Sequence, residues 1–547
     1  MRVSNGRSLW RSKREDIFFS GHLQADDEAD DIDNDEADDD DDDDENDEDD
    51  EMNELNLQIN GLTDEVTGLG QVAQQSMNLA VGLTRLGVRK GDRVALCSEN
   101  RIEFWSSIVG TVLAGAVVTT INVTYTKGEI AHAMGISKPK YIICSEIAYK
   151  HHEKTFRSLK HVDKIIVYGE KANAVSFNEL VTKNEVKPEE FVPVDVEGQN
   201  DLAFILYSSG TTGLPKGVMI THLNCLNTFC FPKIEPPFHP IVLNVNPWFH
   251  AMGLMAGLLA LSSGRTMVYL PKFELDLYLK TIEKYKITVI QVVPPILVAL
   301  TKIQINYDVS SVIMVFCGAA SLRSEVSNAA QKLFPNALPV LQGYGMTETT
   351  LACTLNTNFL DPKPGCVGQV SHNAIIKIID LKTKEALGPN KEGEICIKGG
   401  SVMKGYVGKD RKDDFDEEGF FRTGDIGYYD EERYFYIVDR LKELIKYKAY
   451  QVPPAEIEAV LLEHPEVRDA GVVGVPHAGA GEVPRAFVAL QPGASVTAEE
   501  LQKFVAERLS NPKHLRGGVR FVPEIPKNIS GKILRRKLKE MANKSKL

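Results

Sequence analysis

Hydrophobic and polar residues follow two different periods along the chain. From Gly70, apolar residues recur at helical spacing, with Val72, Leu79, Leu83 and Leu86 on one face, which predicts an amphipathic helix. Short runs rich in β-branched and aromatic residues predict buried strands at 94–97, 141–144, 164–168, 288–292 and 312–316. Because helical patterns separate these runs, we expect an α/β domain whose strands are largely parallel.

The pattern changes after Pro362. Strand-like runs with little helix between them predict a small β-rich subdomain, at 374–380, 393–398 and 434–438. The charged stretch 439–443 is poorly suited to a core, so we place a linker at 439–442. Beyond it we predict an α+β domain of about 100 residues. Its elements are helices at 454–463 and 498–509 and strands at 470–475, 485–490 and 519–522, and Thr497 with Glu500 forms a capping box for the second helix.

These patterns predict an α/β fold in two parts. A large N-terminal α/β domain, with a β-rich subdomain, precedes a small α+β C-terminal domain. The expected order is an acidic leader (1–60), the large domain (61–438), the linker (439–442), the small domain (443–541) and a tail (542–547).

The net charge is unevenly distributed. Of 76 Asp and Glu residues, 21 lie at 26–51, where there is no Lys or Arg, so 55 acids remain against 62 bases. The body is therefore slightly basic, although the whole chain carries −14. Like charges at this density repel each other and bury little apolar surface, so we expect the leader to be disordered. The mild excess of bases, without a recognised motif, gives little support to nucleic-acid binding.

Other compositional signals exclude several classes of protein. The eight cysteines contain no CxxC pair, which suggests neither a zinc site nor a disulfide framework. The uncharged stretch 104–126 holds many Ser, Thr and Gly residues, so we interpret it as a buried helix followed by a strand, and we expect no transmembrane segment. The first 16 residues lack the apolar core of a secretory signal.

The last three residues are Ser545, Lys546 and Leu547. This tripeptide is a peroxisomal address, so we predict the peroxisomal import receptor as a partner and the peroxisome matrix as the location.

The most informative segment is 207–218, YSSGTTGLPKGV. Within ten residues it holds three glycines, four hydroxyl groups and Lys216, so backbone N–H groups, side-chain donors and a cation can converge on an anion. It is not a Walker A loop, because Gly217 and the strand-like 218–220 follow Lys216. The pattern predicts a strand–loop–strand grip on a triphosphate.

This segment resembles the signature of the adenylate-forming superfamily, which includes acyl-CoA synthetases, 4-coumarate:CoA ligases, beetle luciferases and nonribosomal adenylation domains. Similar blocks follow in family order, at 342–348, 421–425, 438–448 and 526–532. The chain is most similar to the 4-coumarate:CoA ligase and luciferase branch. The resemblance implies an adenylation domain of stacked α/β subdomains and a mobile C-terminal domain. It also implies the activity of an ATP-dependent acid:CoA ligase. Such an enzyme activates a fatty or arylpropanoid acid as acyl-AMP, releases pyrophosphate and then forms the acyl-CoA thioester.

The resemblance also implies roles for individual residues in binding ATP and Mg²⁺. The β- and γ-phosphates would be held by Ser208, Ser209, Gly210, Thr211, Thr212 and Lys216. Thr347 would contact the α-phosphate, Glu348 would bind Mg²⁺, and His250 would lie beside the acyl carboxylate. Adenine and ribose would be bound by Gly318, Ala319, Ala320, Gly343, Tyr344, Asp425 and Arg440.

The small domain would serve both half-reactions. Lys532 would enter the adenylation site and bridge the substrate carboxylate and the phosphate. Rotation of the small domain about the linker would then withdraw Lys532. The same rotation would bring the loop 446–451, with Lys446, to the site for the second half-reaction, in which coenzyme A attacks the acyl group. We interpret Arg535 and Arg536 as solvated residues. Ala449 replaces a glycine of relatives, and its methyl group would crowd the path of pantetheine in thioester formation. The acidic leader replaces early folded elements of relatives, including a strand and a helix.

Two other functions remain open. A luciferase-like oxygenase would adenylate its substrate with the same residues, but Leu351 stands where beetle luciferases usually carry a serine, and an apolar residue suits an acyl chain better. A non-catalytic interaction protein would bind basic partners through the acidic leader. We expect the acyl pocket at 226–255 and 318–352, whose apolar character indicates a hydrophobic acid without identifying it.

Overall fold

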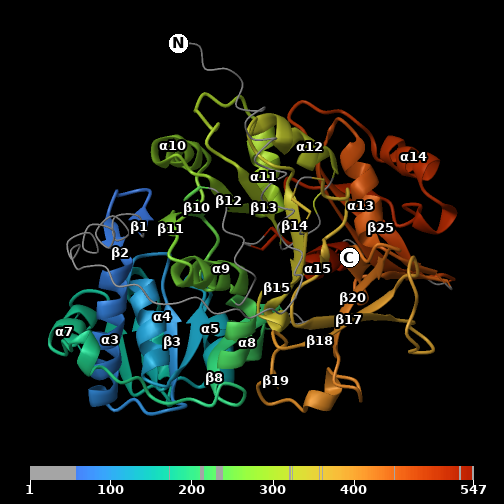
Figure 1. The fold of residues 1–547 in the computed structure, drawn as a ribbon. Coiled ribbons are helices and arrows are strands. Elements are labelled where there is room, and N and C mark those ends of the chain that lie inside the picture. Colours follow the sequence, from blue (N-terminus) through green and yellow to red (C-terminus); the bar gives the residue numbers. More distant parts are fainter. Residues whose placement is uncertain are drawn as a thin grey trace, which may run out of the picture. The chain divides into compact units, whose positions relative to one another are not determined.

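The computed structural model describes residues 57–171, 173–209, 215–229, 238–318, 322, 324–356, 358–359, 361–448, 450–477, 479–528 and 531–544. All of them belong to one compact unit, Glu51–Leu547, and only this unit is described below (Figure 1). The predictions for the acidic leader and for the terminal tripeptide lie outside the described residues and stay predictions.

The first α/β layer is built on a mostly parallel sheet with the strand order β19-β9-β8-β4-β3-β5-β6-β7. Alternate residues of β3 pack on opposite sides, Val94 and Leu96 with α3 and α4, and Ala95 and Cys97 with α5 and α6, so helices cover both faces. The strands are β3 (Arg93–Cys97), β4 (Val117–Ile121), β5 (Tyr141–Cys144), β6 (Lys164–Val167), β7 (Val175–Ser176), β8 (Leu202–Ser209), β9 (Pro215–Thr221) and β19 (Gly405–Tyr406). The helices are α3 (Leu69–Leu86), α4 (Glu103–Leu113), α5 (Lys127–Ser137), α6 (Glu146–Ser158), α7 (Phe177–Thr182) and the 3₁₀ turn η1 (Pro188–Glu190).

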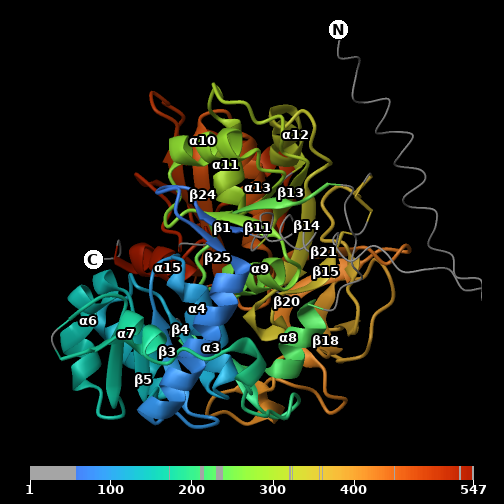
Figure 2. The same ribbon diagram turned by 60° about the vertical axis from the view of Figure 1, so that its left-hand side comes forward.

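The second α/β layer has the strand order β16-β15-β14-β13-β12-β10-β11-β1-β2. Helix α9 contacts β10 and β11 and packs on α4 of the first layer, where Trp105 fills the space beside Gly257 (Figure 2). The strands are β1 (Leu57–Asn60), β2 (Val66–Gly68), β10 (Ile241–Asn244), β11 (Thr266–Tyr269), β12 (Val289–Val292), β13 (Met314–Cys317), β14 (Leu341–Gly345), β15 (Ala352–Leu355) and β16 (Gln369–Val370). The helices are α9 (Ala251–Ser262), α10 (Leu275–Tyr285), α11 (Pro294–Thr301), α12 (Ser324–Leu333) and η2 (Thr347–Thr349). Helix α8 (His222–Phe229) contacts β8 and β9 of the first sheet and α9 of the second layer.

The structure places the first strand, β1, inside the region that we predicted to be a disordered leader. We expected residues up to 60 to lack structure and an early strand to be missing, but β1 pairs in parallel with β11 and Ile59 is buried. The four residues fold because their backbone groups complete an existing sheet and because an apolar side chain reaches the core.

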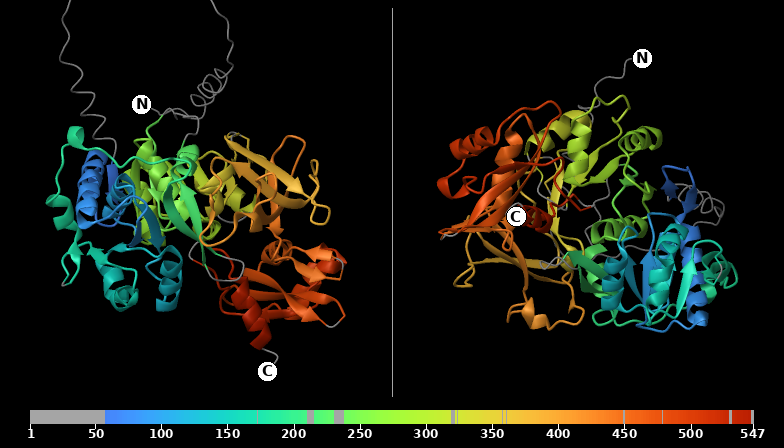
Figure 3. Two further views of the ribbon diagram at one scale, coloured as in Figure 1. Left: turned by 90° about the horizontal axis from the view of Figure 1, so that it is seen from below. Right: turned by 180° about the vertical axis from the view of Figure 1, so that it is seen from behind.

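The β-rich subdomain and the small domain follow as predicted (Figure 3). The subdomain sheet has the order β17-β18-β20-β21, with β17 (Ala374–Ile379), β18 (Gly393–Gly399), β20 (Phe421–Tyr429), β21 (Phe435–Arg440) and the turn η3 (Arg411–Asp413). The small domain contains β22 (Ile445–Tyr447), β23 (Tyr450–Val452), α13 (Pro454–Glu463), β24 (Val467–His477), β25 (Gly481–Leu490), α14 (Ala498–Arg508), η4 (Asn511–Lys513), β26 (Val519–Phe521) and α15 (Arg535–Lys544). The capping box is present, since Glu500 N donates to Thr497 Oγ1 (3.2 Å) and Thr497 N to Glu500 Oε2 (2.8 Å).

The predicted linker is more buried than its charges suggested. Asp439 and Arg440 end strand β21, and Asp439 is only 8% exposed. Its carboxylate accepts hydrogen bonds from Arg440 N (2.7 Å) and from Ala455 N (3.0 Å), at the start of α13. Burial raises the pKa of Asp439 to about 6, against the effect of the nearby Arg535. Charged residues are tolerated here because each has a partner.

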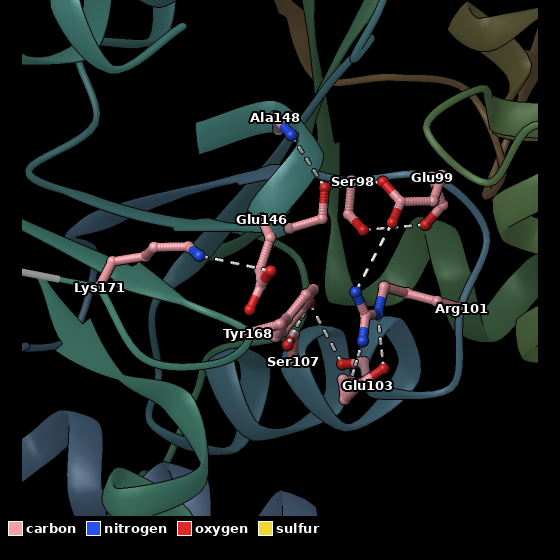
Figure 4. A network of polar contacts seen from close by, with 10 residues as sticks. Ser98, Glu99, Arg101, Glu103, Ser107, Glu146, Ala148, Tyr168 and Lys171 are labelled. Carbon is pink, nitrogen blue, oxygen red and sulfur yellow. Dashed lines mark hydrogen bonds and ion pairs between the residues drawn. The ribbon is translucent and has the colours of Figure 1, made fainter. Parts of the chain in front are cut away.

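A polar network fixes the loop after β3 (Figure 4). Arg101 donates to both oxygens of Glu103, from Nε at 2.7 Å, and lies 4.9 Å from the centre of the Tyr168 ring. Ser145 donates to Glu99 (2.6 Å), which connects the ends of β3 and β5. The neighbouring Asn100 donates to the carbonyl of Asn246 in the second layer (3.0 Å). The carboxyl edges of the two sheets are therefore held against each other.

Two further observations concern the excluded classes. In the part of the chain that the structure covers, no helix is long and apolar enough to cross a membrane, and 104–126 forms the buried α4 and strand β4 as predicted. Seven cysteines lie in that part, and all seven are buried and free.

Candidate active site

A cavity of about 1720 Å³ opens where the carboxyl ends of the two sheets meet. Its wall comes from both α/β layers, from the β-rich subdomain and from the small domain. The carboxyl edge of a parallel sheet is the usual place for a ligand in α/β proteins. The cavity contains most of the predicted site residues that the structure describes.

The phosphate grip is a strand–loop–strand unit, as predicted. Strands β8 and β9 are antiparallel and place Ser208 opposite Lys216, and both line the cavity. The loop between them, with Gly210, Thr211 and Thr212, and the side chain of Ser209 lie outside the described residues. The Lys216 ammonium lies 4.4 Å from the centre of the Tyr406 ring. Burial, together with the charge of Lys409, lowers the pKa of Lys216.

Thr347 and Glu348 belong to the short turn η2 and also line the cavity. Glu348 is 7% exposed, and its Oε1 accepts a hydrogen bond from the Tyr406 hydroxyl (2.7 Å). No described residue donates to its Oε2. Because Mg²⁺ usually binds through one or two carboxylates plus waters and substrate phosphates, a single buried carboxylate with a free oxygen fits this ion. Glu348 is therefore the residue suited to hold Mg²⁺.

Asp425 lies behind the cavity wall rather than in it. It is 4% exposed, its Oδ2 accepts from the Tyr344 hydroxyl (2.7 Å), and its Oδ1 lies 3.0 Å from Arg440 Nε. This last contact is an ion pair without hydrogen-bond geometry, so Oδ1 has no hydrogen-bond donor among the described residues. Burial raises the pKa of Asp425, while Arg440 and Tyr344 oppose this change. A buried carboxylate oxygen without a donor, such as Asp425 Oδ1, is suited to accept a hydrogen bond from a sugar hydroxyl.

The nucleobase side of the site is only partly described. Gly318, Gly343 and Arg440 line the cavity, and Ala319 and Ala320 lie outside the described residues. The ring of Tyr344, predicted to pack on adenine, is 9% exposed and does not line the cavity. Gly343 has no space for a side chain, because a Cβ there would lie 2.9 Å from the carbonyl oxygen of Thr354. In this structure Tyr344 supports Asp425 instead of forming the wall.

Lys532 enters this cavity from the small domain. Its backbone N–H donates to Asn528 Oδ1 (2.8 Å), which closes a tight turn. Gly531 has a φ of +79°, and a Cβ there would lie 2.3 Å from Cγ of Pro295 at the start of α11, so only glycine fits. Burial, together with the positive charge of Arg440, lowers the pKa of Lys532 to about 8. The close contact between this turn and Pro295 therefore positions the amine of Lys532 in the cavity.

The acyl side of the cavity is apolar. His250 immediately precedes α9 and lines the cavity, and burial lowers the pKa of its ring, so the imidazole is neutral at neutral pH. Side chains at alternate positions of the parallel strands form the opposite wall. They are Val242, Val289, Gln291, Met314 and Phe316.

Two predicted residues lie elsewhere. Lys446 is exposed on β22 and does not line the cavity, and Ala449 lies outside the described residues. The interpretation of Arg535 as a solvated residue is wrong, whereas Arg536 is exposed as predicted. Arg535 donates from Nε to Glu443 (2.6 Å) and from Nη2 to Glu458 (3.1 Å), and its side chain is 12% exposed.

Sequence reasoning missed two parts of the site. Tyr406 follows a glycine in a short strand, and no local signal marks it as a partner of Glu348. The pocket prediction also omitted residues of β12 and β13, although their β-branched runs were recognised as strands. Their alternation was the available signal, because every second residue of a strand faces the same side.

The chain is similar to two protein-family models and to individual relatives. A model of the AMP-binding enzyme matches residues 64–407, and one of the AMP-binding enzyme C-terminal domain matches residues 456–532. The chain belongs to the AMP-binding enzyme family. Luciferin 4-monooxygenase of Nipponoluciola cruciata is 41% identical to this AMP-binding enzyme over 502 residues, covering 88% of this chain and 91% of that protein. Probable 4-coumarate–CoA ligase 3 of Dictyostelium discoideum is 39% identical over 513 residues, covering 89% and 92%.

The solved structures agree with this placement. ATP-bound MatB from Rhodopseudomonas palustris has a TM-score of 0.81 with the AMP-binding enzyme at 28% identity, covering 89% of this chain and 96% of that chain. The resemblance to the adenylate-forming superfamily, in the branch of luciferases and 4-coumarate–CoA ligases, is thereby confirmed, as is the α/β fold with a large and a small domain.

Proposed function

We propose that the protein is an ATP-dependent acid:CoA ligase, which activates a hydrophobic carboxylic acid as acyl-AMP and transfers the acyl group to coenzyme A. The observation that carries the proposal is that Lys532 of the small domain lines the same cavity as His250 and Glu348 of the large domain. An amine, a neutral imidazole and a free carboxylate oxygen are thus placed around one space.

In the first half-reaction, a carboxylate oxygen of the acid attacks the α-phosphorus of ATP. The bond to the β-phosphate breaks, and pyrophosphate leaves with its electron pair. Both reactants are anions, so the residues must orient them and neutralise charge. Lys216 and protonated Lys532 supply the positive charge, Thr347 a hydroxyl donor, and Asp425 an acceptor for the ribose. Mg²⁺ bound at Glu348 would neutralise phosphate charge.

In the second half-reaction, the thiol of coenzyme A attacks the acyl carbonyl, loses its proton and displaces AMP. Lys446 is exposed in this structure and outside the cavity, so this step needs a different position of the small domain. The linker at Asp439 and Arg440 is where we expect the rotation.

Leu351 supports a ligase over a luciferase-like oxygenase. It lines the cavity beside Leu355 and Ala352, where an acyl chain would lie. An apolar wall gains from burying methylene groups and offers no partner to a polar substituent. A luciferase-like activity is the alternative that the test below must exclude.

The test supplies ATP, Mg²⁺ and coenzyme A with a panel of fatty and phenylpropanoid acids, and measures pyrophosphate, acyl-AMP and acyl-CoA separately. We expect Lys532→Ala to slow acyl-AMP formation at least 100-fold while leaving thioester formation from supplied acyl-AMP intact. Lys446→Ala, the matched control, should do the reverse. Light from luciferin without any acyl-CoA, or undiminished acyl-AMP in the Lys532 variant, would overturn the proposal.

The same assay has a pH signature. Lys532 acts as a cation and its pKa is lowered to about 8, so adenylation should fall as the pH rises through about 8. Lys532→Arg should shift this descending limb to higher pH, because arginine stays protonated.

A further inference from the structure

Arg265, at the far end of the apolar side of the cavity, has no side-chain partner among the residues that the structure describes. It lies between the end of α9 and the start of β11, it is half-buried, and it lines the cavity. Its backbone N–H donates to the carbonyl of Ala260 (3.0 Å). Its guanidinium has no hydrogen bond, ion pair or ring contact with any residue that the structure describes.

Other partly buried arginines of the described chain do have partners. Arg101 binds Glu103, Arg440 lies against Asp425, and Arg535 binds Glu458 and Glu443. Burial lowers the pKa of Arg265, and no carboxylate of the described residues opposes this change. A partly desolvated cation without a counter-ion is costly, so a ligand that supplies the missing charge would stabilise Arg265.

The separation between Arg265 and His250 determines how long a ligand that reaches both residues must be. Helix α9 runs along the cavity from Ala251, next to His250, to Ser262, close to Arg265. Twelve helical residues span roughly 18 Å. Between the two ends, the lining is mostly apolar, with Gln291 as a polar residue. It includes Met252, Ala256, Leu259, Val242, Val289 and Met314.

We infer that Arg265 binds a second carboxylate at the far end of the substrate, so that the preferred acid is an α,ω-dicarboxylic acid with a polymethylene chain. This inference rests on the proposed function, since it places the reacting carboxylate beside His250 and Lys532. A guanidinium matches a carboxylate through two parallel hydrogen bonds, which gives both charge and orientation. Allowing for the reach of the arginine side chain, the chain length that fits is roughly ten to fourteen carbons.

The test compares pairs of acids of equal length on the full chain. Decanedioate, dodecanedioate and tetradecanedioate are set against decanoate, dodecanoate and tetradecanoate, and 12-hydroxydodecanoate tests a neutral polar end. The measurements are kcat/KM for pyrophosphate release and, independently of turnover, calorimetric binding. We expect at least one diacid to exceed its monoacid by tenfold or more.

Substitutions at position 265 then assign the preference. Arg265→Leu should lower the kcat/KM ratio of diacid to monoacid at least tenfold and raise kcat/KM for the monoacid, because the unpaired charge is gone. Arg265→Lys should keep part of the preference. Lys280→Gln removes an exposed charge on α10 and should leave the ratio unchanged.

The possible negative results distinguish the role of Arg265 from the proposed function. Preference for the monoacid or for 12-hydroxydodecanoate, or equal losses for both acids in Arg265→Leu, would overturn the role of Arg265 and leave the proposed function intact. Tight binding of a diacid that depends on Arg265, without any acyl-AMP, would support the site and overturn the proposed function instead.

Discussion

At the scale of single residues, the site depends on side chains that hold other side chains in place. Tyr406 is the clearest case, because its hydroxyl donates to Glu348 (2.7 Å) and its ring lies under the Lys216 ammonium. The tyrosine therefore contacts both the carboxylate suited to Mg²⁺ and the cation suited to the phosphates, without reaching the acid itself.

Tyr406→Phe should raise the Mg²⁺ concentration needed for half-maximal adenylation about tenfold. The hydrogen bond to the charged Glu348 contributes roughly 1.5–3 kcal/mol, and the retained ring preserves the contact with Lys216. Pyrophosphate exchange over a series of Mg²⁺ concentrations measures this.

Tyr406→Leu, which also removes the ring, should weaken ATP binding as well. An unchanged Mg²⁺ dependence in the phenylalanine variant would mean that Tyr406 does not position Glu348.

At the scale of elements, buried charges fix the small domain around its last helix. Arg535 begins α15 and binds Glu443, which follows the linker, and Glu458, on α13. Glu458 also accepts the N–H of Val472 on β24 (2.6 Å). One guanidinium thus joins three elements of the domain that carries Lys532.

Replacing Arg535 by Ala should destabilise the small domain by about 3 kcal/mol or more, because the buried Glu458 and the partly buried Glu443 would lose their cation. Arg536→Ala is the matched control. Arg536 is exposed and, among the described residues, pairs with Glu540 alone (2.9 Å), so its loss should cost less than about 0.5 kcal/mol. Urea unfolding measures both variants, and equal effects would contradict the buried network.

At the scale of the whole molecule, the described site belongs entirely to the unit Glu51–Leu547. Every described residue that lines the cavity lies between Glu99 and Lys537, within the unit Glu51–Leu547. Residues 1–50 hold 22 Asp and Glu against 5 Lys and Arg, so they account for all of the net negative charge of the chain. We therefore expect catalysis not to require the acidic segment.

A chain consisting of residues 51–547 should keep kcat/KM for acyl-AMP formation within about twofold, because every described residue that lines the cavity belongs to it. Pyrophosphate exchange and thermal unfolding of both chains measure this. If activity disappeared with the leader, the leader would be part of the catalytic unit. If neither chain were active, an interaction protein would be the better description.

The sequence alone determined the order of the secondary-structure elements, several local motifs and the family of this protein. The order of strands and helices, the strand–loop–strand at Ser208 and Lys216, and the capping box at Thr497 follow from local patterns, because period, turn chemistry and caps act over a few residues. The family followed from blocks of residues in a fixed order, which the comparisons confirmed.

The tertiary structure alone decided which charges are paired. The burial of Arg535 and Asp439 and the contact between Tyr406 and Glu348 depend on residues distant in the chain. The same holds for Arg265, which has no side-chain partner in the part of the chain that the structure describes. Lys, Arg, Asp and Glu look alike in sequence whether solvated or buried, because the free energy of a charge depends on its surroundings in space.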